Sequence, residues 1–199
     1  MFKSLASELR SALVMLLLMT ALTGVVYPLL VTVSGKVLFP RQAAGSFIDQ
    51  RDQTAGSELI GQPFSEAKYF WSRPSATSPH PYKADASSGS NFGPTNKSHI
   101  DGVSNRVKAL RESGVDVNVK VPVDLVTASA SGLDPHISPA AAEIQVARVA
   151  RARNLSEERI RGLVAQFTED RQWGMMGEPR VNVLRLNLAL DDAAKAEKP

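Results

Sequence analysis

The sequence predicts an α+β soluble domain anchored by a single N-terminal transmembrane helix. The first observation behind this prediction is a run from Ser11 to Gly35 that contains no charged residue. The second is that the rest of the chain carries helical periodicity between short strand-like segments. The 199 residues suffice for one ordinary domain and an appendage. Hydrophobic residues at 43% and charged residues at 22% indicate a globular chain rather than a disordered one.

The charge-free run is long enough to cross a bilayer. Arg10 and Lys36 border it, and a helix of this length spans roughly 37 Å, more than the ~30 Å hydrocarbon core. A cleaved signal peptide has a shorter apolar stretch of about 7–15 residues, followed by small residues at the cleavage site. Residues 33–40 are a poor cleavage site. We therefore expect residues 1–35 to form a retained anchor, with a span of about 11–35, and residues 36–199 to form one soluble α+β domain.

Three helices are predicted in the soluble domain. Apolar residues at helical spacing predict a helix over 100–110, with Gly114 as its C-terminal stop. Ser138–Pro139 is typical of a helix start, and the Ala-rich segment after it predicts a helix to about Arg153. Ser156, followed by two glutamates, predicts the start of a third helix.

Two further segments predict strands, and one predicts a helical turn. The segment 56–64 is short, apolar and bounded by glycine, so we expect a strand entering a turn. In 181–190, leucines alternate with other residues from Leu184 onward, which predicts a half-buried strand. Pro122 is suited to the first position of a short helix toward Ser129.

Composition excludes several classes of site and partner. The chain has no cysteine, so disulfide frameworks, thiolate zinc sites and iron–sulfur clusters are excluded. Three histidines leave little material for a metal site, and we expect no metal and no tightly bound cofactor. The net charge of +3 is too small for the basic field of a nucleic-acid-binding protein, so no nucleic-acid partner is expected.

The densest polar cluster lies in the segment 121–138. Ser129 or Ser131 with His136 and an aspartate, Asp124 or Asp134, supplies the residue types of a hydrolase triad. The cluster lacks the Gly-x-Ser-x-Gly sequence of a nucleophile elbow, and structural turns and helix caps account for the same residues. We therefore expect no catalytic residue here. A membrane-anchored periplasmic hydrolase that uses the Ser129/Ser131–His136 cluster is the alternative.

A long segment, 72–98, is rich in Ser, Pro, Gly, Thr and Asn. Loops of this length are uncommon in compact domains and are usually functional or linkers. Aromatic residues lie before and inside this one, which favours an ordered loop whose aromatics pack on the domain or on a partner. The candidate partner-interface residues are Tyr69, Phe70, Trp71 and Phe92.

Four segments, in order along the chain, resemble the C subunit of the Kdp-type potassium-transporting ATPase. They are 69–76, 87–96, 121–145 and 178–191. The resemblance covers nearly the whole chain and includes one anchor at the expected end. Two departures are mild: Phe167 stands where the family usually has histidine, and Trp-Gly-Met-Met-Gly at 173–177 varies a Leu-Gly-Phe-Leu-Gly pattern.

The resemblance implies a single-span, non-catalytic subunit with no activity alone, in a bacterial inner-membrane complex that imports K⁺ with high affinity at the expense of ATP. It implies a cytoplasmic N-terminus and a periplasmic domain. The implied partners are a channel-like K⁺-translocating subunit, a P-type ATPase subunit, a small accessory subunit and membrane lipid. The subunit would assist assembly and act as a catalytic chaperone that raises the ATP affinity of the ATPase subunit.

A nucleotide site is implied by the resemblance alone. The family's signature-like stretch falls on Ser129, Ser131, Gly132 and Gln145. Because ATP is cytoplasmic and the implied domain is periplasmic, the assembly role has more weight than direct contact with ATP.

Overall fold

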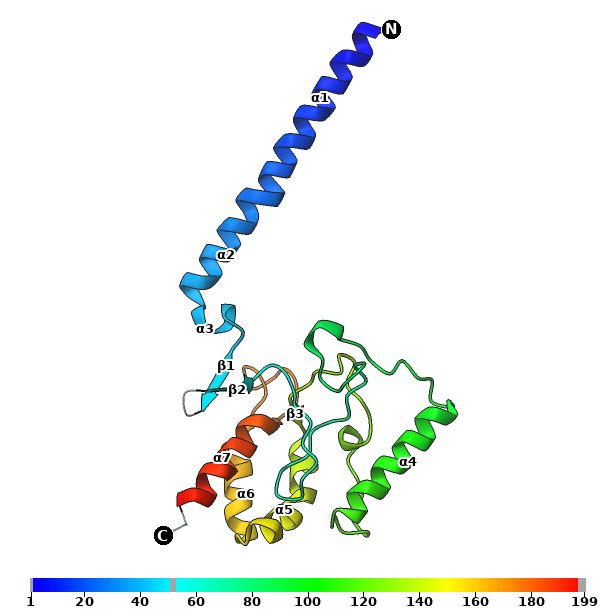
Figure 1. Ribbon diagram of the computed structural model, residues 1–199, viewed down its shortest axis with the longest axis vertical. Coiled ribbons are helices and arrows are strands. Elements are labelled where there is room, and N and C mark those ends of the chain that lie inside the picture. Colours follow the sequence, from blue (N-terminus) through cyan, green and yellow to red (C-terminus); the bar gives the residue numbers. More distant parts are fainter. Residues whose placement is uncertain (1, 51–52, 197–199) are drawn as a thin grey trace. The chain divides into compact units, whose positions relative to one another are not determined.

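The computed structural model describes residues 2–50 and 53–196 (Figure 1). The chain divides into two compact units, Met1–Phe47 and Ile48–Pro199. The first unit is helical and the second contains both helices and sheet, so the predicted α+β class with one N-terminal anchor helix is confirmed.

The first unit is one long helical rod followed by a short turn of helix. The rod consists of α1 (Phe2–Ala21), the π-helical segment η1 (Leu22–Val26) and α2 (Tyr27–Leu38), and α3 (Pro40–Ala43) follows it. The residues Ala6–Leu38 are apolar enough and long enough to cross a membrane, and no residue of their most apolar 18-residue stretch is buried within the protein. An apolar helix exposed on all sides is suited to a lipid environment rather than to water.

The π-helical segment explains how a proline is accommodated in the middle of the rod. Pro28 has no N–H to donate, and its ring would clash with the carbonyl four residues earlier in a regular α-helix. In the widened turn the N–H of Tyr27 reaches back to the carbonyl of Leu22, and the Thr23 hydroxyl donates to the carbonyl of Met19 at 2.7 Å. The rod therefore continues past Pro28 without a break.

The second unit combines four helices with a small antiparallel sheet. The helices are α4 (Lys97–Glu112), α5 (Pro139–Arg153), α6 (Glu157–Gln166) and α7 (Val183–Ala196). The sheet has the order β3-β5-β4, with β3 (His136–Ile137), β5 (Arg180–Asn182) and β4 (Thr168–Glu169). Val181 in the central strand lies opposite both Ile137 and Thr168. Two further strands, β1 (Phe47–Gln50) and β2 (Gln53–Ser57), pair separately, and η2 (Ala84–Ala86) and η3 (Val123–Leu125) are single 3₁₀ turns.

The predicted helix boundaries of α5 and α6 are confirmed by their caps. The Ser138 hydroxyl accepts a hydrogen bond from the N–H of Ala141 at 3.1 Å, and the Ser156 hydroxyl accepts one from Arg159 at 3.3 Å. Asn154 ends α5 in the left-handed conformation. The predicted helix over 100–110 is also present, within α4. These ends were readable because capping is a local property of a few adjacent residues.

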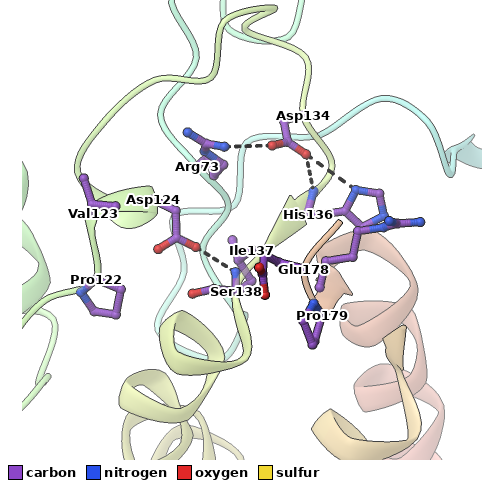
Figure 2. A pocket seen from close by; sticks show the side chains of 11 residues that line it. Arg73, Pro122, Val123, Asp124, Asp134, His136, Ile137, Ser138, Glu178 and Pro179 are labelled. Carbon is purple, nitrogen blue, oxygen red and sulfur yellow. Dashed lines mark hydrogen bonds and ion pairs between the residues drawn. The ribbon is translucent and has the colours of Figure 1, made fainter. Parts of the chain in front are cut away.

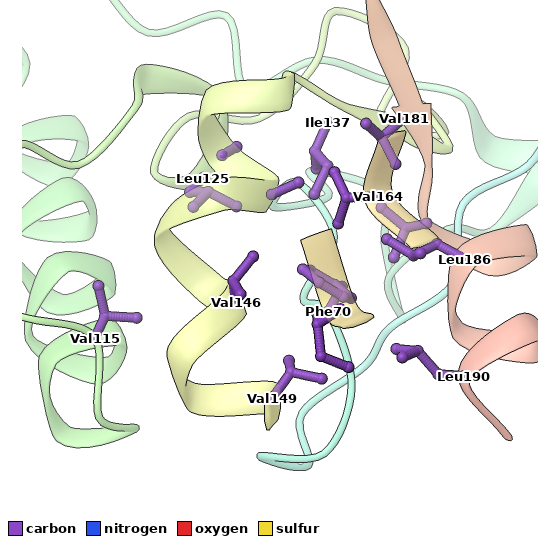
Figure 3. Packing of buried hydrophobic residues seen from close by; sticks show 14 of the residues in the cluster. Phe70, Val115, Leu125, Ile137, Val146, Val149, Val164, Val181, Leu186 and Leu190 are labelled. Carbon is purple, nitrogen blue, oxygen red and sulfur yellow. The ribbon is translucent and has the colours of Figure 1, made fainter. Parts of the chain in front are cut away.

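The core lies between α5, α6, α7 and the sheet (Figure 3). Leu110 of α4 belongs to the same cluster of buried residues. Phe70, which belongs to no helix or strand, is fully buried at its centre together with Val146 and Leu186. The chain that leads into the 72–98 loop is thus tied to the domain by Phe70, one of the aromatics that precede the loop, whereas Phe92 inside the loop is exposed.

The strand predicted over 181–190 is wrong beyond its first residues. β5 ends at Asn182 and α7 begins at Val183. A Leu-x-Leu-x-Leu pattern fits a strand, but Leu186 and Leu190 are also four residues apart, and both are fully buried on one face of α7. The helix forms because that face covers the core, which an extension of the central strand β5 would leave open.

The strand predicted over 56–64 and the short helix predicted from Pro122 are correct only in part. The strand ends at Ser57, and a turn follows in which the N–H of Ile60 donates to the carbonyl of Ser57 at 3.3 Å. After Pro122 the chain makes one 3₁₀ turn, Val123–Leu125. Both segments are short, so contacts from elsewhere in the domain decide their conformation.

Replacing Leu17 by arginine tests the membrane role of the rod. We expect Leu17→Arg to deplete the chain from the membrane fraction, because an arginine at mid-helix costs about 2.5–3.5 kcal/mol of insertion free energy. Leu9→Arg is the matched control, since Leu9 is also exposed on the helix but lies next to Arg10 near its end. Equal membrane yields for both variants would contradict the prediction.

Candidate functional site

An extended aromatic segment of the chain is clamped between α5 and α7 by two side-chain amides. The Asn187 amide oxygen accepts from the N–H of Phe70 at 2.9 Å, and its NH₂ donates to the carbonyl of Phe70 at 3.0 Å. The Gln145 amide does the same for Trp71, at 2.8 Å and 3.3 Å. Each amide therefore supplies the donor and acceptor that a neighbouring strand would supply, which lets this backbone be buried without a sheet partner.

Arg148 of α5 extends the amide clamp. Its guanidinium donates to the carbonyl of Ala67 at 2.7 Å and to the amide oxygen of Gln145 at 2.6 Å, and it stacks 4.8 Å from the Trp71 ring centroid. Only 3% of Arg148 is exposed, and its partners are neutral oxygens and an aromatic face rather than carboxylates. Burial lowers the pKa of Arg148 to about 10, so the side chain is still charged at neutral pH.

A second arginine of α5 fixes Tyr69. Arg153 donates to the carbonyl of Lys68 at 2.6 Å and to the carboxylate of Asp191 at 2.8 Å, and its guanidinium lies 5.1 Å from the Tyr69 ring centroid. The Tyr69 hydroxyl donates to the same carboxylate at 3.0 Å. Burial, followed by this hydrogen bond to Asp191, raises the pKa of Tyr69. The consecutive aromatics Tyr69, Phe70 and Trp71 are thus all held by their own domain.

The serine-rich turn of the polar cluster is held by its own backbone. The Ser129 hydroxyl accepts from the N–H of Gly132 at 2.9 Å, and the Ser131 hydroxyl accepts from the N–H of Leu133 at 3.1 Å. Gly132 has a φ of +67°, and a Cβ there would lie 2.6 Å from the carbonyl oxygen of Ser88. Only glycine fits where the two chain segments approach this closely.

The four residues that the resemblance implies for nucleotide do not share one pocket. Ser129 and Ser131 line an open depression of about 520 Å³, together with residues that include Arg73 and Asp134. Gln145 is fully buried in the amide clamp, where its oxygen accepts two hydrogen bonds and its NH₂ donates to the carbonyls of Trp71 and Ala141. Its amide thus has no free donor to offer a ligand, and the nucleotide site stays a prediction.

A neighbouring pocket of about 400 Å³ is lined by several charged side chains, among them Arg73, Asp124 and Asp134 (Figure 2). Asp134 lines this pocket and is paired with Arg73 at 2.9 Å, and it accepts from the N–H of His136 at 3.0 Å. Burial by itself would raise the pKa of Asp134, but hydrogen bonds from His136 and the charge of Arg73 hold that pKa below its ordinary value. Asp124, at another side, accepts from the N–H of Ser138 at 2.7 Å.

The geometry does not support the hydrolase alternative. The ring nitrogens of His136 face carboxylates, with Nδ1 at 3.5 Å from Asp134 and Nε2 at 3.9 Å from Glu169. The hydroxyls of Ser129 and Ser131 face backbone amides of their own turn. A triad needs the serine hydroxyl on the imidazole, so these residues have the right types without the right arrangement.

Metal-ligating side chains are not gathered either. Across residues 2–50 and 53–196, no group of three or more His, Asp or Glu side chains could hold a metal ion.

Of the four predicted partner-interface residues, Phe70 is a core residue, and Tyr69 and Trp71 are half-buried in the clamp. Phe92 is exposed and lies 6.2 Å from the His99 ring, so it is the one that offers most of its side chain to a partner. Their role at an interface stays a prediction.

Besides Phe92, the domain has another exposed apolar group, which the sequence did not predict. It lies between β4 and β5, where the residues with the largest exposed apolar side chains are Trp173, Met175 and Met176. The signal available in the sequence was a tryptophan before a glycine and two methionines between glycines, with no helical or strand periodicity to bury them.

A rod able to cross a membrane, followed by a small α+β unit whose polar clusters bind its own backbone, defines the class of single-span, membrane-anchored α+β proteins. Residues 9–192 match the family model described as KdpC, the c chain of the K⁺-transporting ATPase. The chain therefore belongs to the KdpC family.

Individual relatives agree with the family match. The chain is 60% identical to the potassium-transporting ATPase KdpC subunit of Methylococcus capsulatus, over 93% of this chain and 97% of that one. It is 58% identical to the protein of the same name from Dechloromonas aromatica, over 94% and 98% of the two chains. For the one from Burkholderia cenocepacia (strain J2315) the identity is 57%, over 96% and 98%.

Replacing Gln145 by leucine tests whether this residue is structural. Leucine cannot bond the N–H and carbonyl of Trp71, and a buried backbone group left unpaired costs about 1–3 kcal/mol. We expect Gln145→Leu to lower the free energy of unfolding by about 2–6 kcal/mol, measured by thermal denaturation of the purified full chain in detergent. Each kcal/mol corresponds to a fall in Tm of about 2–4 °C.

Gln166→Leu is the control for Gln145→Leu. Gln166 is an exposed amide at the end of α6, so its loss should change stability by no more than about 0.5 kcal/mol. If Gln145→Leu melts at the same temperature as this control, the residue is not structural and is free for a ligand role.

Proposed function

We propose that this chain is the accessory, non-catalytic subunit of an ATP-driven, high-affinity K⁺ import complex. The observation that carries the proposal is the family match over residues 9–192, together with close relatives that are named as potassium-transporting ATPase KdpC subunits. The partners in the proposal are a channel-like K⁺-translocating subunit, a P-type ATPase subunit and a small accessory subunit. The chain assists their assembly and, as a catalytic chaperone, raises the ATP affinity of the ATPase subunit.

In this proposal the chain acts on ATP affinity through contact with other subunits. Two features favour this route over direct binding of nucleotide. The amide of Gln145 is fully used in the clamp, and the hydroxyls of Ser129 and Ser131 accept from backbone amides. A ligand can be bound more tightly by a neighbouring subunit when the accessory chain stabilises that subunit's binding-competent state.

The proposal places the chain in the bacterial inner membrane as a single-pass protein, with its N-terminus cytoplasmic and its C-terminal domain periplasmic. The apolar residues Ala6–Leu38 support the single pass. The orientation rests on the family resemblance, because large C-terminal domains translocate largely regardless of flanking charge.

Co-expression with the other subunits tests the assembly role. We expect the full chain to co-purify in detergent with the K⁺-translocating and ATPase subunits. We expect the complex prepared without the chain to show an apparent KM for ATP raised about fivefold or more, within the range usual for coupling between sites. A chain that purifies alone, or that by itself turns over ATP or an ester, would overturn the proposal.

Reporter fusions at the C-terminus test the orientation. A reporter that is active only outside the cytoplasm, fused after Pro199, should be active in cells that produce the full chain. The same reporter fused at residue 5, before the apolar span, is the control and should be inactive. Activity of a cytoplasm-only reporter after Pro199 would reverse the orientation and restore direct contact with ATP as the favoured route.

A further inference from the structure

The connection between β4 and β5 presents an apolar tip to solvent. We call residues 170–178 the apolar finger; all nine are exposed. Trp173 is 84% exposed, Met175 78% and Met176 47%. A cluster of large apolar side chains rimmed by polar residues on a soluble domain marks an interaction surface. The contrast with Trp71 is direct, because that tryptophan lies under the guanidinium of Arg148 in the same domain.

The apolar finger has a defined shape rather than that of a loose loop. Gln172 and Met176 form an isolated antiparallel bridge, with N–H to carbonyl distances of 2.8 Å and 2.9 Å. Arg171 and Glu178 form an ion pair of 2.7 Å across its base. Below that base, Glu169 and Arg180 are directly opposed in the sheet. The tip is therefore attached to the domain through two adjacent paired strands.

The backbone of the tip also holds Trp173 in place. Trp173 has a φ of +52°, which is uncommon for a bulky residue, and Gly174 and Gly177 have φ values of +75° and +77°. This turn leaves the Trp173 side chain in water. A preorganised apolar tip loses little conformational entropy when it binds, and tryptophan is among the residues that contribute most at protein interfaces.

Charge decides which kind of partner fits. The finger carries two exposed acids, Asp170 and Glu178, and one base, Arg171, so its net charge is −1. An anionic bilayer surface attracts basic segments and repels acidic ones, so the finger is poorly suited to lipid headgroups. Methionine side chains adapt to irregular apolar pockets in proteins. The complementary surface is an apolar pocket with lysine or arginine at its rim.

We infer that the apolar finger inserts Trp173 and Met175 into an apolar, basic-rimmed pocket on another subunit of the K⁺-transporting ATPase complex. The inference rests on the proposed function, since it needs the complex to form. It concerns a surface separate from the Tyr69–Trp71 segment, whose side chains are held within the domain.

Photocrosslinking in the assembled complex tests the inference. A benzophenone amino acid replaces Trp173 in the full chain, which is co-expressed with the other subunits, irradiated and analysed by mass spectrometry. We expect one main crosslink, to a different subunit, at a site with basic residues nearby. The same probe in place of Val117, another strongly exposed apolar residue after α4, is the control and should not reach that site.

Substitutions test the two components of the surface separately. Trp173→Ala should speed the exchange of the full chain out of the purified complex by about thirtyfold, as for a residue that dominates an interface. Asp170→Lys should slow the association of the chain with the other purified subunits by about fivefold and weaken its salt dependence, as for an exposed charge at the rim of an interface. Glu112→Lys, an exposed charge reversal at the end of α4, should leave exchange unchanged.

These experiments distinguish failure of the proposed function from failure of the inference about the apolar finger. If the unmodified chain does not assemble with the other subunits, the proposed function fails. If it assembles normally, but the probe at 173 crosslinks only to lipid, to a second copy of this chain or to nothing, the inference about the finger is overturned and the proposed function stands. An unchanged exchange rate for a folded Trp173→Ala chain also overturns the inference about the finger.

Discussion

The amide clamp is the interaction on which the soluble unit depends, because it buries an extended backbone that has no strand beside it. Gln145 and Asn187 each bond both backbone groups of one residue, and Phe70 fills the centre of the core as a result. Each such bond contributes only about 0.5–1.5 kcal/mol net, but leaving the same buried groups unpaired costs about 1–3 kcal/mol each. The main effect of the clamp is thus to satisfy the backbone groups that this packing buries, rather than to add net stability. It fixes α5 and α7 on either side of one segment.

Several polar residues that suggest a functional site in the sequence instead stabilise the fold. Gln145 holds Trp71, Ser129 closes a turn, and Asp134 orders its own loop while pairing with Arg73. Buried polar groups in a small domain must find partners, and short loops rich in Ser, Asp and Gly supply those partners locally. Such a loop gathers the residue types of catalysis without their geometry. Among the exposed features that this architecture does not use, the apolar finger carries the largest apolar side chains.

The sequence predicted what is encoded locally and missed what distant contacts decide. The anchor and the starts of α5 and α6 follow from an uncharged run and from caps at Ser138 and Ser156. The leucines of the 181–190 segment fit both the strand period and the helix period. The segment forms a helix because its apolar face is needed to cover the core. The pairing of Phe70 with Asn187 joins residues 117 positions apart, so no short pattern could reveal it. The same holds for the exposure of Trp173, because burial is a property of the whole domain.

Rigidity links the clamp to the surface. An accessory subunit without chemistry of its own can influence a neighbour only by binding one of that neighbour's states better than another. Such discrimination needs a contact surface that does not yield, since a flexible one would adapt to both states. Here β5 carries one end of the apolar finger and continues directly into α7, the helix whose Asn187 holds the core segment. A partner that contacts Trp173 therefore acts on β5, a strand that the clamped helix α7 holds in place. A domain needs this kind of rigid connection if its tip is to distinguish between two states of a partner.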